Sequence, residues 1–159
     1  WLVTGVLLLS AAIVLLFRPF MPSVLAAYAG LWVMNLSGLT HFQSNEIVFW
    51  GIATVIVLGI DYLRVRPAVT TGYQRAYVAG GTLTGMILGL LISPTYGGVA
   101  GSAAGSVLGL VAYRMTPAGR GSSTAVIGSL CSVGLPAIVT CSIVALALRA
   151  VIAASIITQ

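Results

Sequence analysis

The chain has 159 residues, of which 59% are hydrophobic and 6% are charged. Soluble domains usually have about a quarter charged residues, so this composition excludes an ordinary soluble fold. We expect a single integral-membrane domain over residues 1–159, built as an all-α polytopic bundle. The net charge of +5 comes from seven arginines that are scattered along the chain, so nucleic-acid binding is not expected.

Six apolar segments approach the roughly 20 residues that a bilayer-spanning helix needs. We predict helices over 1–17, 22–36, 47–63, 76–92 and 97–113, and within 124–157. No basic segment stands before the first, which favours a spanning helix over a cleaved signal peptide. The last stretch is too long for one simple span and contains Pro136. It is either one kinked helix or a half-helix followed by a full span.

Glycines recur at every fourth position in two of these segments. They are Gly81, Gly85 and Gly89, and then Gly97, Gly101, Gly105 and Gly109. Such a stripe has no side chains, so another helix backbone can approach it closely. A tight turn around Pro94 separates the two runs and predicts a hairpin. The sequence predicts a glycine zipper, whose two stripes face either each other or a shared neighbour.

A shift of 75 residues aligns the first half of the chain with the second. Pro19 then meets Pro94, Pro22 meets Gly97, and Gly30 meets Gly105. One interpretation is a 3+3 inverted repeat with halves 1–66 and 76–159, an arrangement that transporter folds share. The other is chance, since small residues are abundant in this chain.

The arginines also predict an orientation. If residue 1 starts outside, all six loop arginines fall on the inner side, as the positive-inside rule requires: Arg18, Arg64, Arg66, Arg75, Arg114 and Arg120. We therefore expect a multi-pass protein of the bacterial inner membrane, with cytoplasmic arginine-rich loops and an external N-terminus.

Four charged residues are candidates for binding. Asp61 lies near the inner end of the third segment, where it either pairs with Arg64 at the interface or contacts an ion or substrate. Arg149, in the last segment, either snorkels to the outer interface or faces the interior and binds an anion. Arg18 opens the corner formed by Pro19 and Pro22, which is a plain turn or the lining of a re-entrant cavity.

Catalysis and cofactor binding are not expected. The single His41 and the two acids, Glu46 and Asp61, make no nucleophile–base constellation. One histidine and the distant Cys131 and Cys141 make no metal site. Glu46 is expected only to stabilise the positive N-terminus of the third helix.

The order of motifs resembles a known family. A Pro-x-x-Pro corner at Pro19 and Pro22 is followed by the sequence AAYAGL at 26–31, then by a helix ending in IDY at 60–62, and finally by a glycine-rich hairpin at 80–109. This order is similar to that of small bacterial membrane proteins grouped as domain of unknown function 456. The resemblance implies a membrane bundle in which glycines pack helices, and it implies no particular activity.

Two functions follow as hypotheses. The first is a small transporter, channel or lipid-handling protein. The second is a non-catalytic accessory or scaffold subunit that packs against itself or a membrane-protein partner. Both hypotheses place the chain in a lipid bilayer.

Overall fold

A computed structural model gives the fold. It describes residues 2–17, 23–36, 43–63, 72–93, 96–120, 128 and 130–157. The described chain is helical and shows no strand. Its elements are α1 (Leu2–Leu15), α2 (Ser23–Leu36), α3 (Ser44–Leu63), α4 (Gly72–Ile92), α5 (Gly97–Met115), α6 (Pro117–Arg120), the π-helical turn η1 (Leu130–Gly134) and α8 (Leu135–Ile157).

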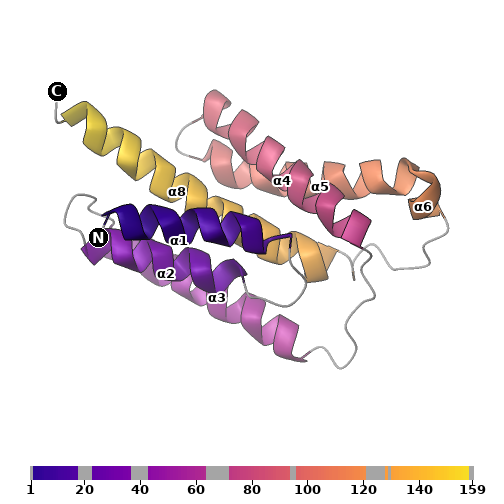
Figure 1. Ribbon diagram of the computed structural model, residues 1–159, viewed down its shortest axis with the longest axis horizontal. Helices are drawn as coiled ribbons and strands as arrows, with labels where there is room; N and C mark the ends of the chain where they lie inside the picture. Colours follow the sequence, from indigo (N-terminus) through magenta and orange to yellow (C-terminus); the bar gives the residue numbers. More distant parts are fainter. Residues whose placement is uncertain are drawn as a thin grey trace.

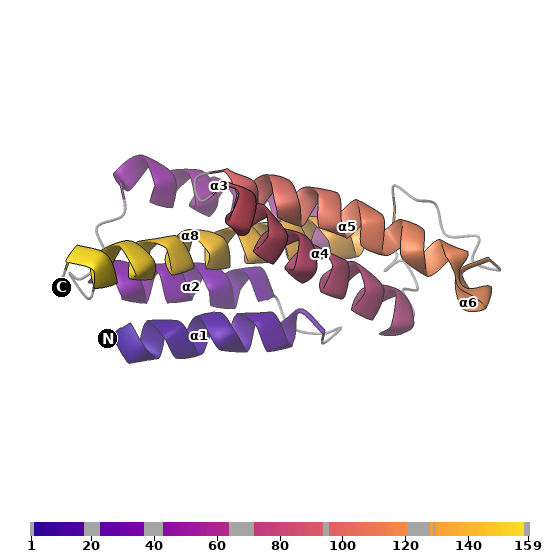
Figure 2. The same ribbon diagram turned by 90° about the horizontal axis from the view of Figure 1, so that it is seen from above.

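Six long helices run up and down along one common direction (Figures 1 and 2). Each runs opposite to the one before it, so α1 begins and α8 ends at the same end of the bundle. We call this the N/C end; the opposite end is the α6 end. Glu46 in the first turn of α3 belongs to the N/C end, whereas Arg75, Arg114 and Arg120 belong to the α6 end, where α4 begins and α5 ends.

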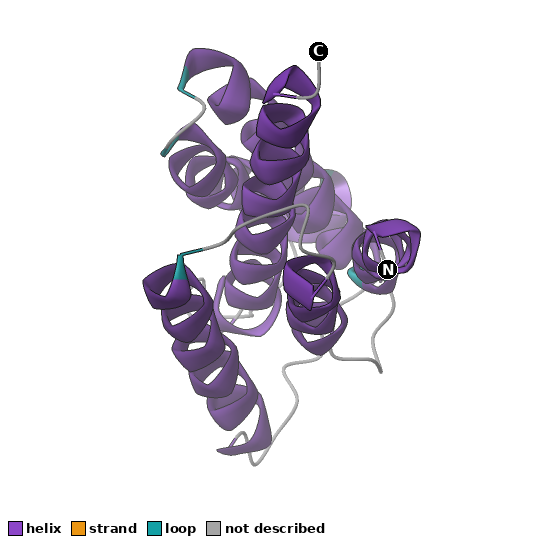
Figure 3. Ribbon diagram, turned by 90° about the vertical axis from the view of Figure 1, so that its left-hand side faces the viewer, coloured by secondary structure: helices purple, strands orange, loops and turns teal. Residues whose placement is uncertain are grey.

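Helix α8 is the centre of the bundle. It contacts all five of the helices α1 to α5, and in Figure 3 it runs from the C-terminus through the middle of the bundle. The α1–α2 hairpin packs on it from one side and the α4–α5 hairpin from another, while α3 packs against α2 and α8. A chain segment with this many helix neighbours must be apolar or small on most faces, as the sequence of α8 is.

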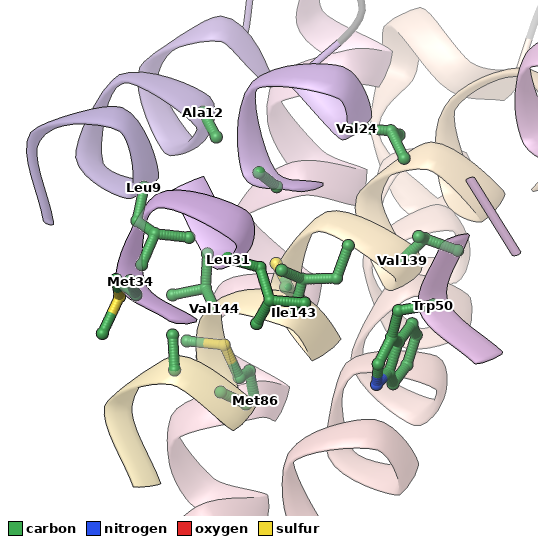
Figure 4. Close-up of a cluster of buried hydrophobic side chains, with 14 of the residues drawn as sticks. Leu9, Ala12, Val24, Leu31, Met34, Trp50, Met86, Val139, Ile143 and Val144 are labelled. Atoms are coloured by element: carbon green, nitrogen blue, oxygen red, sulfur yellow. The ribbon is translucent and has the colours of Figure 1, made fainter. Parts of the chain in front are cut away.

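The main core forms where α8 meets α1, α2 and α3. Leu31 and Met34 of α2 and Ile143 of α8 are fully buried there, with Trp50 of α3 beside them (Figure 4). Met86 of α4 joins the same cluster, so the core is continuous from one hairpin to the other.

The last helix crosses the bundle once. Residues 130–134 form a π-helical turn that leads directly into α8, and Pro136 is its second residue. Proline is tolerated in the first turn of an α-helix, and the π-helical turn stands directly before it. Over the described residues 130–157, this stretch is one continuous helix, which agrees with the first of the two alternatives.

Two predicted helices begin earlier than expected. Helix α3 begins at Ser44 and α4 at Gly72, because polar residues join their first turns. In α3, the backbone N–H of Glu46 donates to the carbonyl of Gln43 at 2.8 Å. In α4, Gln74 is buried. Glu46 thus lies inside the first turn of its helix and not before it.

By length and apolarity, two described helices could cross a membrane. They are Gly72–Ile92 and Leu130–Ala153. The other apolar helices are shorter, and α5 is rich in glycine, which lowers its hydropathy. Helix length and composition therefore indicate two membrane-spanning helices among the described residues.

Candidate functional site

Helices α4 and α5 approach each other backbone to backbone. A Cβ placed on Gly81 would lie 2.5 Å from the carbonyl oxygen of Gly105, and one on Gly85 would lie 2.8 Å from the Cα of Gly105. One on Gly89 would lie 3.0 Å from the Cα of Gly101. Real Cβ atoms do not come this close to backbone, so each position requires glycine. The two stripes therefore face each other, which is one of the two arrangements that the sequence left open.

The absence of side chains along this contact leaves a groove on the outer side of the hairpin. It has a volume of about 780 Å³ and is lined almost entirely by apolar atoms. Its lining includes the glycines of both stripes, the small side chains of Ala100, Ala104 and Ala112, and the larger side chains of Leu88 and Leu108. The groove runs from Tyr96, at the N/C end, to Ala112.

A second pocket opens at the N/C end, between α3, α5 and α8. Its volume is about 740 Å³, and it is more polar than the groove. Its polar and aromatic lining residues are Asn45, Glu46, Phe49, Trp50, Tyr96 and Arg149. We call it the end pocket. Tyr96 and Ala100 line both the end pocket and the groove, so the two spaces adjoin.

The first turn of α3 and the last third of α8 position the charged groups of the end pocket. Glu46 is half-buried, and Arg149 is exposed. Both are described residues, and they form no ion pair with each other. Phe49 and Trp50 pack edge to face, with ring centroids 5.3 Å apart, and Trp50 is buried. The aromatic wall of the pocket is thereby fixed against the core.

Apart from Gln74, the buried polar side chains of the described bundle are hydroxyls of serine and threonine. The hydroxyls of Ser23 and Thr140 lie 3.2 Å apart, and those of Ser102 and Ser142 lie 3.3 Å apart. These two pairs join α8 to α2 and to α5. Throughout the described chain, no buried side-chain nitrogen or oxygen lacks a partner. The described interior is thus a packed core with satisfied polar groups.

The predicted candidates have different outcomes. Arg149 is exposed, and it also lines the end pocket. The backbone of Asp61 lies in the last turn of α3, but its side chain is outside the described part of the structure. Arg18, Pro19, Pro22, Arg64 and Pro94 also lie outside the described residues. The described residues include no group of three His, Cys, Asp or Glu side chains that could hold a metal ion.

Sequence reasoning missed the other members of the end pocket. Glu46 was expected only to stabilise its helix N-terminus, and Trp50 was not among the candidate residues. They meet Arg149 from about one hundred residues away in the chain, so no local spacing could have linked them. The available signal was that Glu46 and Arg149 fall at the same predicted membrane surface.

Comparisons of the chain with protein families, with curated proteins and with solved structures found no match. The likeness to domain of unknown function 456 therefore stays a prediction.

Proposed function

We propose that this chain is a multi-pass protein of the bacterial inner membrane that binds phospholipid along the α4–α5 hairpin. The first support is the apolar exterior. Large hydrophobic side chains are exposed on every long helix, for example Val55 at 69% and Leu91 at 78%. Soluble monomers rarely expose extended apolar surface, whereas a bilayer would cover it.

In this proposal, the six long helices are six spans. Helices α1 and α2 have 14 described residues each, about 21 Å, which is short for a hydrocarbon core of about 30 Å. Short spans are accommodated by local thinning of the bilayer. The α6 end, with Arg75, Arg114 and Arg120, would be cytoplasmic under the positive-inside rule. The N/C end would then face outside.

The hairpins also support the proposed inverted repeat. A Cβ on Gly30 of α2 would lie 3.1 Å from the Leu9 side chain and 3.3 Å from the carbonyl oxygen of Gly5 in α1, and one on Gly105 of α5 would meet the backbone of Gly81 in α4. In both hairpins, a glycine of the second helix thus faces the first helix. Gly30 and Gly105 are the pair that a shift of 75 residues aligns. Helices α1–α2–α3 and α4–α5–α8 would be the two halves, running in opposite directions.

The lipid function rests on one observation, the junction of an apolar groove with a charged pocket. From Gly97 to Gly109, the groove floor is about 18 Å long, close to the roughly 15 Å thickness of one leaflet. An acyl chain in the groove would place its headgroup near Tyr96, where the end pocket begins. This arrangement fits the outline of one outer-leaflet phospholipid.

The packed interior favours this function over a channel. An aqueous path through the bundle would need polar groups that are free to solvate an ion or solute. The buried hydroxyls of Ser102, Thr140 and Ser142 are instead bonded between or within helices. The scaffold hypothesis would use the same groove for a helix of a second protein, and the experiment below separates these two occupants.

Native mass spectrometry after gentle delipidation tests the proposal. Ala104→Trp fills the groove, whereas the control Val107→Trp places the same side chain at an exposed position of α5 that does not line the groove. We expect Ala104→Trp to lose most of its retained phospholipid and Val107→Trp to keep it. Equal retention by the two variants would contradict the proposal. Dissociation of an oligomer by Ala104→Trp, without loss of lipid, would favour the scaffold.

A further inference from the structure

We propose that the end pocket selects the headgroup of a zwitterionic phospholipid, which combines an ammonium with a phosphate diester. This inference rests on the proposed lipid function and adds the class of headgroup. It follows from the charges, the aromatic side chains and the location of the pocket.

The pocket lining includes one cation and one anion among the described residues. Arg149 reaches it from α8 and Glu46 from the first turn of α3. A guanidinium binds phosphate oxygens in a bidentate manner, and a carboxylate binds an ammonium. Because Glu46 and Arg149 line the same pocket and form no ion pair with each other, both are available to a ligand that enters it. A headgroup with a net negative charge would satisfy Arg149 and be repelled by Glu46.

The aromatic side chains strengthen the match to an ammonium. Phe49, Trp50 and Tyr96 all line the pocket, and the first two are held in an edge-to-face pair. Aromatic faces attract ammonium groups, including quaternary ones, most strongly where water is excluded. Asn45 adds an amide that can accept from an ammonium or donate to a phosphate.

The location of the pocket supplies the remaining argument. Tyr96 and Ala100 belong to both the end pocket and the groove, so a headgroup there is continuous with an acyl chain beside Ala104. Arg149 lies eight residues before the last residue of α8, about 12 Å from the helix end. A long arginine side chain at this depth reaches the level of lipid phosphates.

The test measures lipid competition by native mass spectrometry. Purified full-length protein is offered phosphatidylethanolamine, phosphatidylcholine and phosphatidylglycerol with identical acyl chains. We expect the two zwitterionic lipids to be retained about tenfold more than phosphatidylglycerol, as one charge-assisted contact allows. Arg149→Gln should lower retention of all three, and Arg149→Lys should restore part of it. Glu46→Gln should keep retention but remove the preference.

The matched control is Arg120→Gln, which removes the same charge at the α6 end. Retention by Arg149→Gln equal to that of Arg120→Gln would overturn the assignment. So would equal or stronger retention of phosphatidylglycerol by the unmodified protein, although lipid binding itself would then stand. If Ala104→Trp loses lipid but the unmodified protein shows no headgroup preference, only the present inference is refuted. Retention in Ala104→Trp equal to that in Val107→Trp would refute the proposed function.

Discussion

Replacing Gly81 with alanine tests the close approach of α4 and α5, and the adjacent Gly80 supplies an internal reference. A Cβ on Gly81 would lie 2.5 Å from the carbonyl oxygen of Gly105 and 2.9 Å from the Cα of Gly109. A Cβ on Gly80 would meet no atom within 4 Å. Both substitutions gain the same helix propensity, about 1 kcal/mol over glycine, so this contribution cancels between them.

The remaining difference is the overlap with α5. The atoms that the new Cβ would meet are backbone, so no side chain can rotate away. An ordinary carbon–oxygen contact would require the helices to separate by roughly 1 Å, which forfeits about a quarter to a half of the local dispersion energy. Overpacking of this kind usually costs about 1–3 kcal/mol. Gly81→Ala should therefore be less stable than Gly80→Ala by about 1–3 kcal/mol.

Thermal unfolding in a mild detergent, followed by circular dichroism, measures this difference. For a chain of this size, 1 kcal/mol corresponds to about 2–4 °C in Tm. Gly80→Ala should unfold at or above the temperature of the unmodified protein, and Gly81→Ala several degrees below Gly80→Ala. Equal melting temperatures for the two variants would show that α4 and α5 do not touch along this stripe.

Three further predictions concern the packing and the orientation of the bundle. Ser102→Ala and Ser142→Ala should each lower the free energy of unfolding by about 0.6 kcal/mol, and the double variant should lower it by less than the sum of the two. A double-mutant cycle of unfolding measurements checks this; full additivity would mean that the two hydroxyls do not interact. Met34→Ala should cost about 2–5 kcal/mol in the same assay, because its side chain is fully buried in the main core; a cost under 1 kcal/mol would contradict that burial. The orientation can be tested in spheroplasts with Ser93→Cys and Arg120→Cys, each made in a cysteine-free variant. A membrane-impermeant thiol reagent should label Ser93→Cys in intact spheroplasts and Arg120→Cys only after lysis. The reverse labelling would show that the proposed orientation is inverted.

Much of the fold could be predicted because it depends on local signals. Apolar runs and their flanking prolines located the helices, and the four-residue glycine period identified the hairpin whose helices come closest. The predicted start of α4 was less accurate, because the helix begins at Gly72 and not at residue 76. Its first turn includes the buried Gln74, a polar residue that a search for apolar segments counts as loop. Hydropathy alone also could not decide whether the stretch around Pro136 crosses once or twice.

The candidate site could be predicted only in part. Arg149 stood out because a charged side chain within an apolar span is energetically costly and is therefore a candidate for a functional role. Its neighbours Glu46 and Trp50 come from another helix, and their meeting depends on how α3 packs against α8. The groove is also a tertiary feature. The glycine stripes predicted close packing, but the outward-facing space lined by Ala100 and Ala104 exists only once α4 and α5 have paired.

We propose that one phospholipid lies along the α4–α5 groove. Photocrosslinking with a phosphatidylethanolamine that has a photoreactive group in its acyl chain would locate this lipid. We predict that the adducts concentrate on groove residues such as Leu88, Ala104 and Leu108, with few on equally apolar positions outside the groove such as Val55 and Leu91. Adducts spread evenly over the apolar exterior would contradict it, because they would show the annular lipid that surrounds any membrane protein.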